Sequence, residues 1–262
     1  MKLKGGRFCL GTSGYSYPHW SGGVFYPPGM PQNKWLEYYS EHFSSVELNV
    51  TFYRLPMKKT FDTWYKRTPE NFRFVVKGSR YITHMKLLKD CKEPVERFFE
   101  HVERLGEKLG AVLWQLRPKH SMDCNRLENF LGLLTKRPVT NSVRQVFEFR
   151  HVTWFCEETY ELLRKYGVGL CIAHSDRWPV REEMTAGFVY LRFHGGAALY
   201  SSCYTDEKLK VWASKTKKWL AEGKDVYAYF NNDALGYATK NAHTFREMVG
   251  DMEVPIQPRL LL

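Results

Sequence analysis

Apolar residues along the chain follow two alternating patterns, one typical of helices and one typical of buried strands. Residues 93–109 place Val95, Phe98 and Val102 three or four positions apart, which is the spacing of one face of an α-helix. Further helices are predicted at 34–43, 60–68, 125–137, 157–167, 206–223 and 237–250. Short apolar runs predict strands at 8–12, 45–53, 72–78, 111–118, 144–150, 168–175, 187–195 and 225–233.

This alternation predicts β-α-β units and therefore a parallel sheet. Eight such units in 262 residues fit a (β/α)₈ TIM-like barrel. Residues 177–186 leave little room for a helix, so the sixth helix is expected to be short or missing. No linker divides the chain, which predicts a single domain over 1–262. The alternative is a doubly wound open sheet, but neither G-x-G-x-x-G nor G-x-x-x-x-G-K-[ST] is present to support its nucleotide-binding form.

Polar residues interrupt the predicted strands, mainly in the later half of each one. Parallel strands that are buried on both faces are normally almost wholly apolar. In a parallel barrel the carboxyl ends of all strands meet at one mouth, where such barrels place their active sites. We therefore expect a polar cup built from Glu47, Asn49, Thr51, Lys77, Gln115, Glu148, Arg150, His174, Arg192, His194, Asn231, Asn232 and Asp233.

The segment FEFRHVTW, residues 147–154, shows the question that these charges raise. The two-residue period of a strand directs Glu148 and Arg150 to one face and the phenylalanines to the other. The charged pair can be half of a structural ion network or part of a catalytic site. The same period directs Arg192 and His194 to one side of the seventh strand.

Composition adds few constraints. The chain is 44% hydrophobic and 16% aromatic, which is typical of a folded globular protein. Lysine and arginine exceed acidic residues by 39 to 28, giving a net charge of +11 that favours anionic partners. Much of the excess falls on the exposed face of the predicted helix 206–223. The six cysteines form no C-x-x-C pair, so we expect free thiols and a cytoplasmic protein. No apolar run reaches the roughly 20 residues of a membrane span.

The ordered motifs resemble one known family, the YecE-like proteins of domain-of-unknown-function family 72. GTSGYSYPHW, SSVELNVTFYRLP, VVKGSRYITHMKLLKD, VLWQLRP, FEFRHVTWF, YLRFHG and YAYFNNDALGYATKNA carry this resemblance in order along nearly the whole chain. The resemblance implies a TIM barrel and no established reaction, with a likeness in barrel shape to apurinic endonucleases. The sixth strand, with His174 and Asp176, matches no family motif.

The candidate residues favour a hydrolase or lyase that acts on an anionic, phosphorylated or nucleotide-like substrate without a cofactor. Glu47 and Glu148 are candidates for base and acid, and His194 for proton transfer. Three inward-facing cations and the glycines after the seventh strand suit phosphate. The expected substrate-binding residues are Asn49, Lys77, His84, Gln115, Arg150, Arg192, Tyr200, Asn231 and Asn232.

Three alternatives remain open on the sequence. A non-catalytic nucleic-acid-binding barrel would use the net charge of +11 and exposed aromatic residues. A metal-dependent phosphodiester hydrolase would draw ligands from Glu47, Glu148, His84, His174 and His194. A glycosidase would place Glu47 and Glu148 on either side of a sugar.

Overall fold

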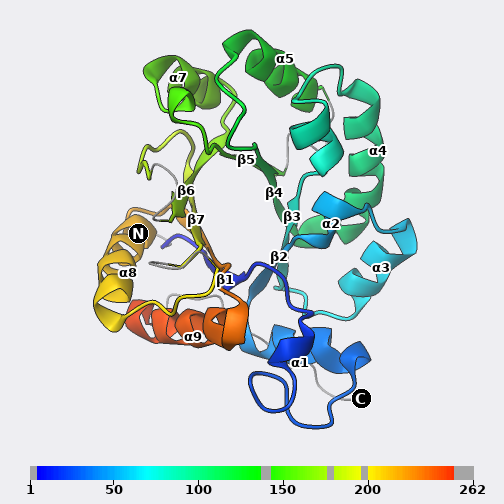
Figure 1. The fold of residues 1–262 in the computed structure, drawn as a ribbon, viewed down its shortest axis with the longest axis vertical. Helices are drawn as coiled ribbons and strands as arrows, with labels where there is room; N and C mark the ends of the chain where they lie inside the picture. The colour runs from blue at the N-terminus through cyan, green and yellow to red at the C-terminus, as the bar shows by residue number, and fades with distance from the viewer. Residues whose placement is uncertain (1–4, 137–142, 176–179, 196–199, 251–262) are drawn as a thin grey trace.

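Eight parallel strands form a nearly closed barrel with helices between them (Figure 1). The computed structural model describes residues 5–136, 143–175, 180–195 and 200–250. The order β1-β8-β7-β6-β5-β4-β3-β2 places each strand beside its neighbour in sequence and pairs the first with the last. The strands are β1 Phe8–Thr12, β2 Ser45–Leu48, β3 Arg73–Lys77, β4 Leu109–Gln115, β5 Arg144–Glu148, β6 Gly169–His174, β7 Phe188–Phe193 and β8 Asp225–Phe230. The predicted TIM-like barrel is confirmed.

Helices surround the strands, and among the described residues a helix follows each strand except β6. The longer ones are α1 Trp35–His42, α3 Lys58–Lys66, α4 Lys92–Val102, α5 Cys124–Leu134, α7 Glu157–Lys165, α8 Asp206–Ala221 and α9 Tyr237–Val249. Short helical segments are η1 Pro18–Trp20, η2 Gln32–Lys34, α2 Val50–Tyr53, η3 Tyr81–Met85, η4 Glu103–Lys108, η5 Val152–Trp154 and η6 Ala234–Gly236. Between β6 and β7 the described residues, 175 and 180–187, contain no helix, as the sequence predicts. Within the described ranges no helix combines the length and apolarity needed to cross a bilayer.

The two faces of each strand enter two different apolar layers. Inward-facing residues fill the barrel, namely Cys9, Val75, Ala111, Leu113, Val146, Cys171, Ala173, Phe188, Tyr190, Tyr227 and Tyr229. Outward-facing residues join the helices in a larger cluster. Phe147 belongs to this outer layer and meets Phe130 of α5 with ring centroids 6.1 Å apart. The prediction that the phenylalanines of FEFR face the helices is therefore confirmed.

Several predicted boundaries are wrong, since the strands predicted over 111–118, 187–195 and 225–233 end two or three residues early and three further segments differ as follows. The strand predicted over 45–53 ends at Leu48 and continues as the helical turn α2, because the Thr51 hydroxyl lies within hydrogen-bonding distance of the carbonyls of Leu48 and Lys77. Asn49 and Thr51 are therefore not strand residues. The helix predicted over 93–109 ends at Val102, and the chain turns through Gly106, which has a φ of 52°. The fifth strand ends at Glu148, so Arg150 lies in the loop that follows.

The barrel is joined most weakly between its first two strands. Apart from a single parallel bridge between Ser13 and Glu47, β1 and β2 have no ladder of their own in the described structure. A side-chain bond reinforces this bridge, because the Ser13 hydroxyl donates to Glu47 Oε1 over 2.7 Å. The contact between β1 and β2 is therefore made through Glu47, one of the charged residues that the sequence predicts at the barrel mouth.

Candidate functional site

A buried ion cluster, formed by Glu47, Glu148, Arg150 and Arg192, lies above the apolar interior of the barrel. The two-residue period explains its height, since Glu47, Glu148 and Arg192 occupy late inward-facing positions of β2, β5 and β7. Arg192 crosses the interior. Its Nε and Nη2 donate to Glu47 over 2.9 and 2.6 Å, and its Nη1 donates to Glu148 over 2.5 Å. The side chains of these three residues are at most 1% exposed.

Glu47 is saturated with donors. Besides two bonds from Arg192, its carboxylate accepts from the Ser13 hydroxyl over 2.7 Å and the Tyr190 hydroxyl over 2.6 Å. Four donors match the capacity of an ionised carboxylate. Glu47 is therefore placed to hold Arg192 in one orientation.

Glu148 is held ionised by two arginines. Arg150 Nε donates to Oε1 over 2.9 Å, while Arg192 binds Oε2. Burial alone would raise the pKa of Glu148, but the two guanidinium groups outweigh it and hold the pKa well below its ordinary value. The charged pair in FEFR is therefore a real ion pair, extended by a second arginine from β7.

His194 is buried against the cluster and neutral. Its Nε2 lies 3.7 Å from Glu148 Oε1, and its Nδ1 lies 3.0 Å from the Asn231 amide nitrogen. Its Nε2 also lies 3.4 Å from Nη1 of Arg192, so donor groups lie beside both ring nitrogens. Burial, reinforced by the charge of Arg192, lowers the pKa of His194 to about 4. The Tyr200 ring lies edge-on to His194 at 5.6 Å.

Lys77 occupies the corresponding inward-facing position at the end of β3, two residues after the interior Val75. It is 9% exposed, and its ammonium lies 4.2 Å from the centroid of the Phe52 ring. Within the described ranges this ammonium donates no hydrogen bond and forms no ion pair. Burial and the charge of Arg192 lower the pKa of Lys77 to about 7.

Gln115 and His84 lie on the same side of the barrel. Gln115 is paired in register with Glu148 and is 3% exposed, and its amide has no hydrogen-bond partner in the part of the chain that the structure describes. His84, on η3, lies 2.9 Å from the Thr83 hydroxyl through Nδ1 and packs edge-on against Phe52. Burial, with the charges of Lys77 and Arg150, lowers the pKa of His84 to about 4.

Other predicted residues lie at the edge of the mouth or outside it. The Asn49 amide donates to the Ser13 carbonyl, while its buried Oδ1 has no partner among the described residues. Asn232 faces outward, because the interior positions of β8 are odd-numbered, and it donates to Ser202 O and Asn241 Oδ1. His174 also faces outward, with Nδ1 2.9 Å from the Tyr204 hydroxyl. Asp176 and Gly196 lie outside the described residues.

Three residues that build the site were not predicted from the sequence. Tyr190 donates to Glu47 and lies two positions before Arg192, so the strand period could have identified it. Ser13 directly follows the carboxyl end of β1, so the rule that strand ends meet at the mouth could also have identified it. Phe52 carries no such signal, since its ring reaches Lys77 only because α2 replaces the end of the predicted strand.

An apolar pocket of about 420 Å³ opens beside the buried ion cluster. Asn49 connects the pocket with the cluster. It lines the pocket and donates to the carbonyl of Ser13, whose hydroxyl donates to Glu47. The pocket lies where the loop after β1 meets β2, α2 and α3. It is lined by Gly14, Tyr15, Ser16, Tyr17, Leu48, Asn49, Val50, Tyr53 and Trp64. These walls suit a flat apolar group better than a charged one.

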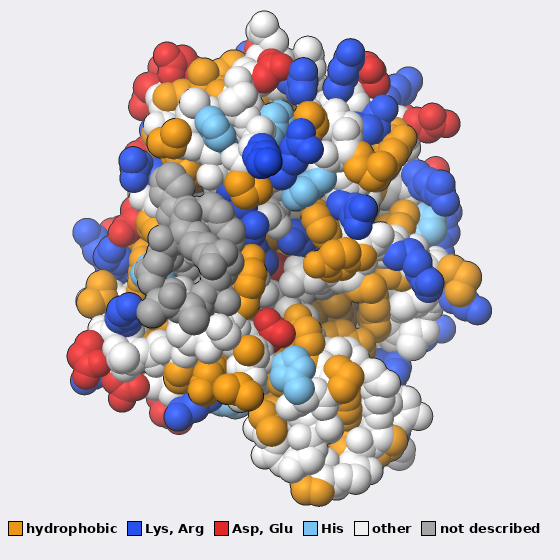
Figure 2. Space-filling model, in the orientation of Figure 1, with side chains coloured by type: hydrophobic (Ala, Val, Ile, Leu, Met, Phe, Trp, Pro, Cys, Tyr) orange, Lys and Arg blue, Asp and Glu red, His pale blue; other side chains and the backbone are white. Residues whose placement is uncertain are grey.

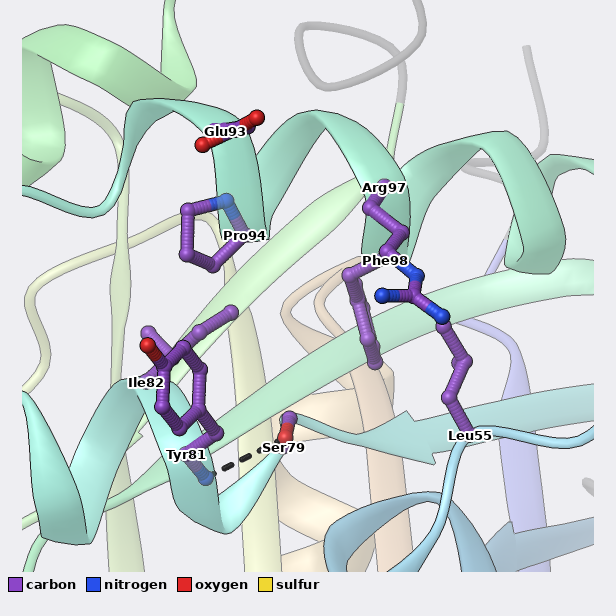
Figure 3. A pocket seen from close by; sticks show the side chains of 8 residues that line it. All are labelled: Leu55, Ser79, Tyr81, Ile82, Glu93, Pro94, Arg97 and Phe98. Atoms are coloured by element: carbon purple, nitrogen blue, oxygen red, sulfur yellow. Dashed lines mark hydrogen bonds between the residues drawn. The ribbon is translucent and has the colours of Figure 1, made fainter.

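A second cavity, of about 480 Å³, lies between η3 and α4 (Figure 3). Figure 3 shows Glu93 and Arg97 on α4 above Tyr81, while Ser79 accepts a hydrogen bond from the Tyr81 amide over 3.2 Å. Because Glu93 and Arg97 are exposed and of opposite charge, this cavity does not select an anion. Figure 2 shows by contrast that Lys, Arg and His side chains gather around the centre of the face where the strands end.

The described residues assemble no group of three or more His, Cys, Asp or Glu side chains that could hold a metal ion. The proposed ligands are engaged otherwise: arginines occupy Glu47 and Glu148, and His174 points away from the mouth. The six cysteines are free thiols, as predicted.

A family model described as "Protein of unknown function DUF72" matches residues 9–260. The chain belongs to the DUF72 family. The DUF72 protein of Thermotoga maritima, a solved structure, superposes with a TM-score of 0.81 at 32% identity, covering 93% of this chain and 99% of the other. The UPF0759 protein YunF of Bacillus subtilis is 27% identical over 90% of this chain and 94% of its own length. The UPF0759 protein YecE of Escherichia coli K12 is 26% identical over 84% and 90%. These DUF72 relatives confirm the resemblance, and their names state no activity.

Proposed function

We propose that this DUF72 protein is an enzyme, of the hydrolase or lyase class, that binds an anionic, phosphorylated or nucleotide-like substrate in the barrel mouth. The observation that carries the proposal is Lys77, a buried amine without a hydrogen bond or ion pair in the described structure. Burying an ammonium without a partner costs several kcal/mol, which is a cost that an anionic ligand would offset. Such a group at the end of a barrel strand is typical of a ligand site.

The charges around Lys77 do not cancel. The two carboxylates of Glu47 and Glu148 are balanced by the two guanidinium groups of Arg192 and Arg150. With Lys77 protonated, this layer of the barrel holds one positive charge in excess. A phosphate or carboxylate placed between Lys77 and Arg150 would balance that charge with charge-assisted hydrogen bonds.

The structure supports a division of roles that differs from the one expected on the sequence. Glu47, Glu148 and His194 are completely buried, so we propose that they orient Arg192 and Arg150 rather than contact substrate. Lys77 and Gln115, with unsatisfied polar groups, are proposed as substrate contacts, together with the 11% exposed Arg150. The apolar pocket beside Asn49 would receive the non-polar part of a nucleotide-like substrate.

Sulfate binding tests this proposal. We expect sulfate to bind wild-type protein in calorimetric titrations at about pH 6, and Arg150→Gln to weaken binding about tenfold by removing one charge-assisted contact. Affinity should fall as the pH rises through about 7, because Lys77 then loses the proton that makes it a cation while sulfate keeps its charge.

The matched control is Arg104→Gln, which removes an exposed arginine paired with Asp62 and should leave sulfate binding unchanged. Equal affinity in wild-type protein and Arg150→Gln would refute the proposed anion site. A panel of phosphorylated sugars and nucleotides, compared with Lys77→Met as the inactive reference, then identifies the reaction.

A non-catalytic nucleic-acid-binding barrel is the second candidate, favoured by the net charge of +11. It predicts that binding of a single-stranded oligonucleotide weakens steeply with salt, with a log–log slope of about −3 or steeper, because phosphate contacts release counterions. Fluorescence anisotropy at several salt concentrations measures this slope. A flat response would eliminate this candidate.

A further inference from the structure

Two buried lysines in this protein differ sharply in their surroundings. Lys108, at the end of η4, is 4% exposed, and its ammonium donates to the carbonyls of Tyr65 and Thr68 over 2.6 and 2.9 Å. Lys77 is 9% exposed, and its ammonium lies 4.2 Å from the centroid of the Phe52 ring. The Lys108 ammonium thus has two carbonyl acceptors, whereas the Lys77 ammonium has no acceptor in the described structure.

Charged groups from several elements face Lys77. They are Arg192 on β7, Glu148 on β5, Glu47 on β2, Arg150 in the loop after β5, and His84 on η3. Burial has the largest effect on the Lys77 amine, followed by Arg192, and both favour its neutral form. The pKa of about 7 means that a substantial fraction of the amine is unprotonated at neutral pH. An unprotonated amine in a buried site is nucleophilic.

We propose that the Lys77 ε-amine forms a covalent imine with an aldehyde or ketone carbon of an anionic substrate. The inference rests on the proposed function, since it places the substrate at the same mouth, and it narrows the substrate class to anionic carbonyl compounds. It also favours the lyase class, because an imine accepts the electron pair of a breaking bond next to its carbon.

The bond changes balance without any oxidant or reductant. The Lys77 nitrogen attacks the carbonyl carbon, and a nitrogen–carbon bond forms while the carbon–oxygen π bond breaks and the oxygen takes one of the two amine protons. The resulting carbinolamine loses its hydroxyl group and the second amine proton as one molecule of water, which leaves a carbon–nitrogen double bond. A proton from solvent then makes the imine a cation, with the same charge as a protonated lysine.

The neighbours of Lys77 suit this step. Arg150 is bound by Glu148, and its charge contributes to the lowered pKa of both Lys77 and His84. Its guanidinium is therefore placed to bind the anionic part of the substrate. The Gln115 amide, which has no partner in the described ranges, is available to the carbonyl oxygen. The Phe52 ring shields one side of the amine, which limits hydrolysis of the imine.

Reductive trapping tests the inference. Full-length protein is incubated with glycolaldehyde phosphate and sodium cyanoborohydride, which reduces an imine to a stable secondary amine, and the adduct is located by peptide mass spectrometry. We expect Lys77 to be labelled at least about tenfold faster than exposed Lys217, with a rate that rises through about pH 7. Uncharged glycolaldehyde should label Lys77 much more slowly, because it lacks the anionic group.

Two variants serve as controls. Lys77→Arg keeps the positive charge and should remove the rapid labelling, whereas Lys217→Arg, on the exposed face of α8, should retain it. Labelling of Lys77 no faster than Lys217, or equally fast with glycolaldehyde and its phosphate, would overturn the inference. If sulfate binds but Lys77 is not labelled rapidly, the inference fails and the proposed anion site stands. If sulfate does not bind at all, the proposed function itself fails.

Discussion

Replacement of Arg192 by methionine is expected to lower the free energy of unfolding by about 3–5 kcal/mol. Methionine fills a similar volume, so the loss arises mainly from charge. Glu47 and Glu148 would both remain in an interior with no solvent access, and Glu47 would have no cationic partner in the described structure. Urea denaturation near pH 7, followed by circular dichroism, measures the effect.

The matched control is Arg164→Met. Arg164 also binds two carboxylates, those of Glu157 and Glu183, each over 2.5 Å, but it is 39% exposed. Its loss should cost no more than about 1 kcal/mol, since water replaces the lost partners. Similar costs for the two variants would mean that the buried ion cluster is not dehydrated in solution.

The deficit of Arg192→Met should depend on pH. In wild-type protein the pKa of Glu148 is depressed, so its contribution to stability is present above about pH 4.5 and is lost as the pH falls further. In the variant, protonation instead relieves the carboxylates that have lost Arg192. The difference between the two proteins should therefore narrow in acid.

Replacement of Lys77 by methionine is expected to stabilise the protein by about 2–4 kcal/mol at or below pH 7, while it abolishes sulfate binding. The pKa of this lysine falls from 10.5 to about 7 on folding, so the protonated amine is less stable in the folded state than in the unfolded state. This penalty is complete below pH 7 and shrinks as the pH rises toward 10.5, where the unfolded chain also loses the proton. The gain should therefore disappear near pH 10.5.

Lys108→Met is the matched control for this prediction. It also removes a buried lysine, but it leaves the carbonyls of Tyr65 and Thr68 without their donor. A loss of about 1–3 kcal/mol is expected, opposite in sign to Lys77→Met. Chemical denaturation at several pH values compares the two. Destabilisation by both variants would show that Lys77 has a structural partner in solution. A gain in stability with loss of binding is typical of a functional residue.

The strand-end positions of the charged residues could be predicted because one rule covers them all. Inward-facing residues late in parallel strands meet at one mouth, and Glu47, Lys77, Glu148 and Arg192 obey this rule. The rule depends on the parity of the position, and Asn232 is an exception because it lies one residue after an inward-facing position and points away from the mouth. The pairing within FEFR was also accessible, because both partners lie in one short segment.

The division of roles within the site could not be predicted. Whether Glu47 contacts a substrate or holds Arg192 depends on distances across the barrel, which the sequence does not encode locally. The positions of Asn49 and Phe52 depend on the turn α2, in which the Thr51 hydroxyl donates to the carbonyls of Leu48 and Lys77. Such long-range bonds override the local apolar pattern of 45–53.

The long reach of Arg192 also bears on the order in which the chain can fold during synthesis. Glu47 and Arg192 are separated by 145 positions, and β1 meets its neighbour β8 only after residue 225 has been made. Until β7 leaves the ribosome, the two carboxylates have no arginine from the far wall and must keep their water. The upper layer of the barrel therefore cannot lose its water before β7 has been made and has reached β2 and β5.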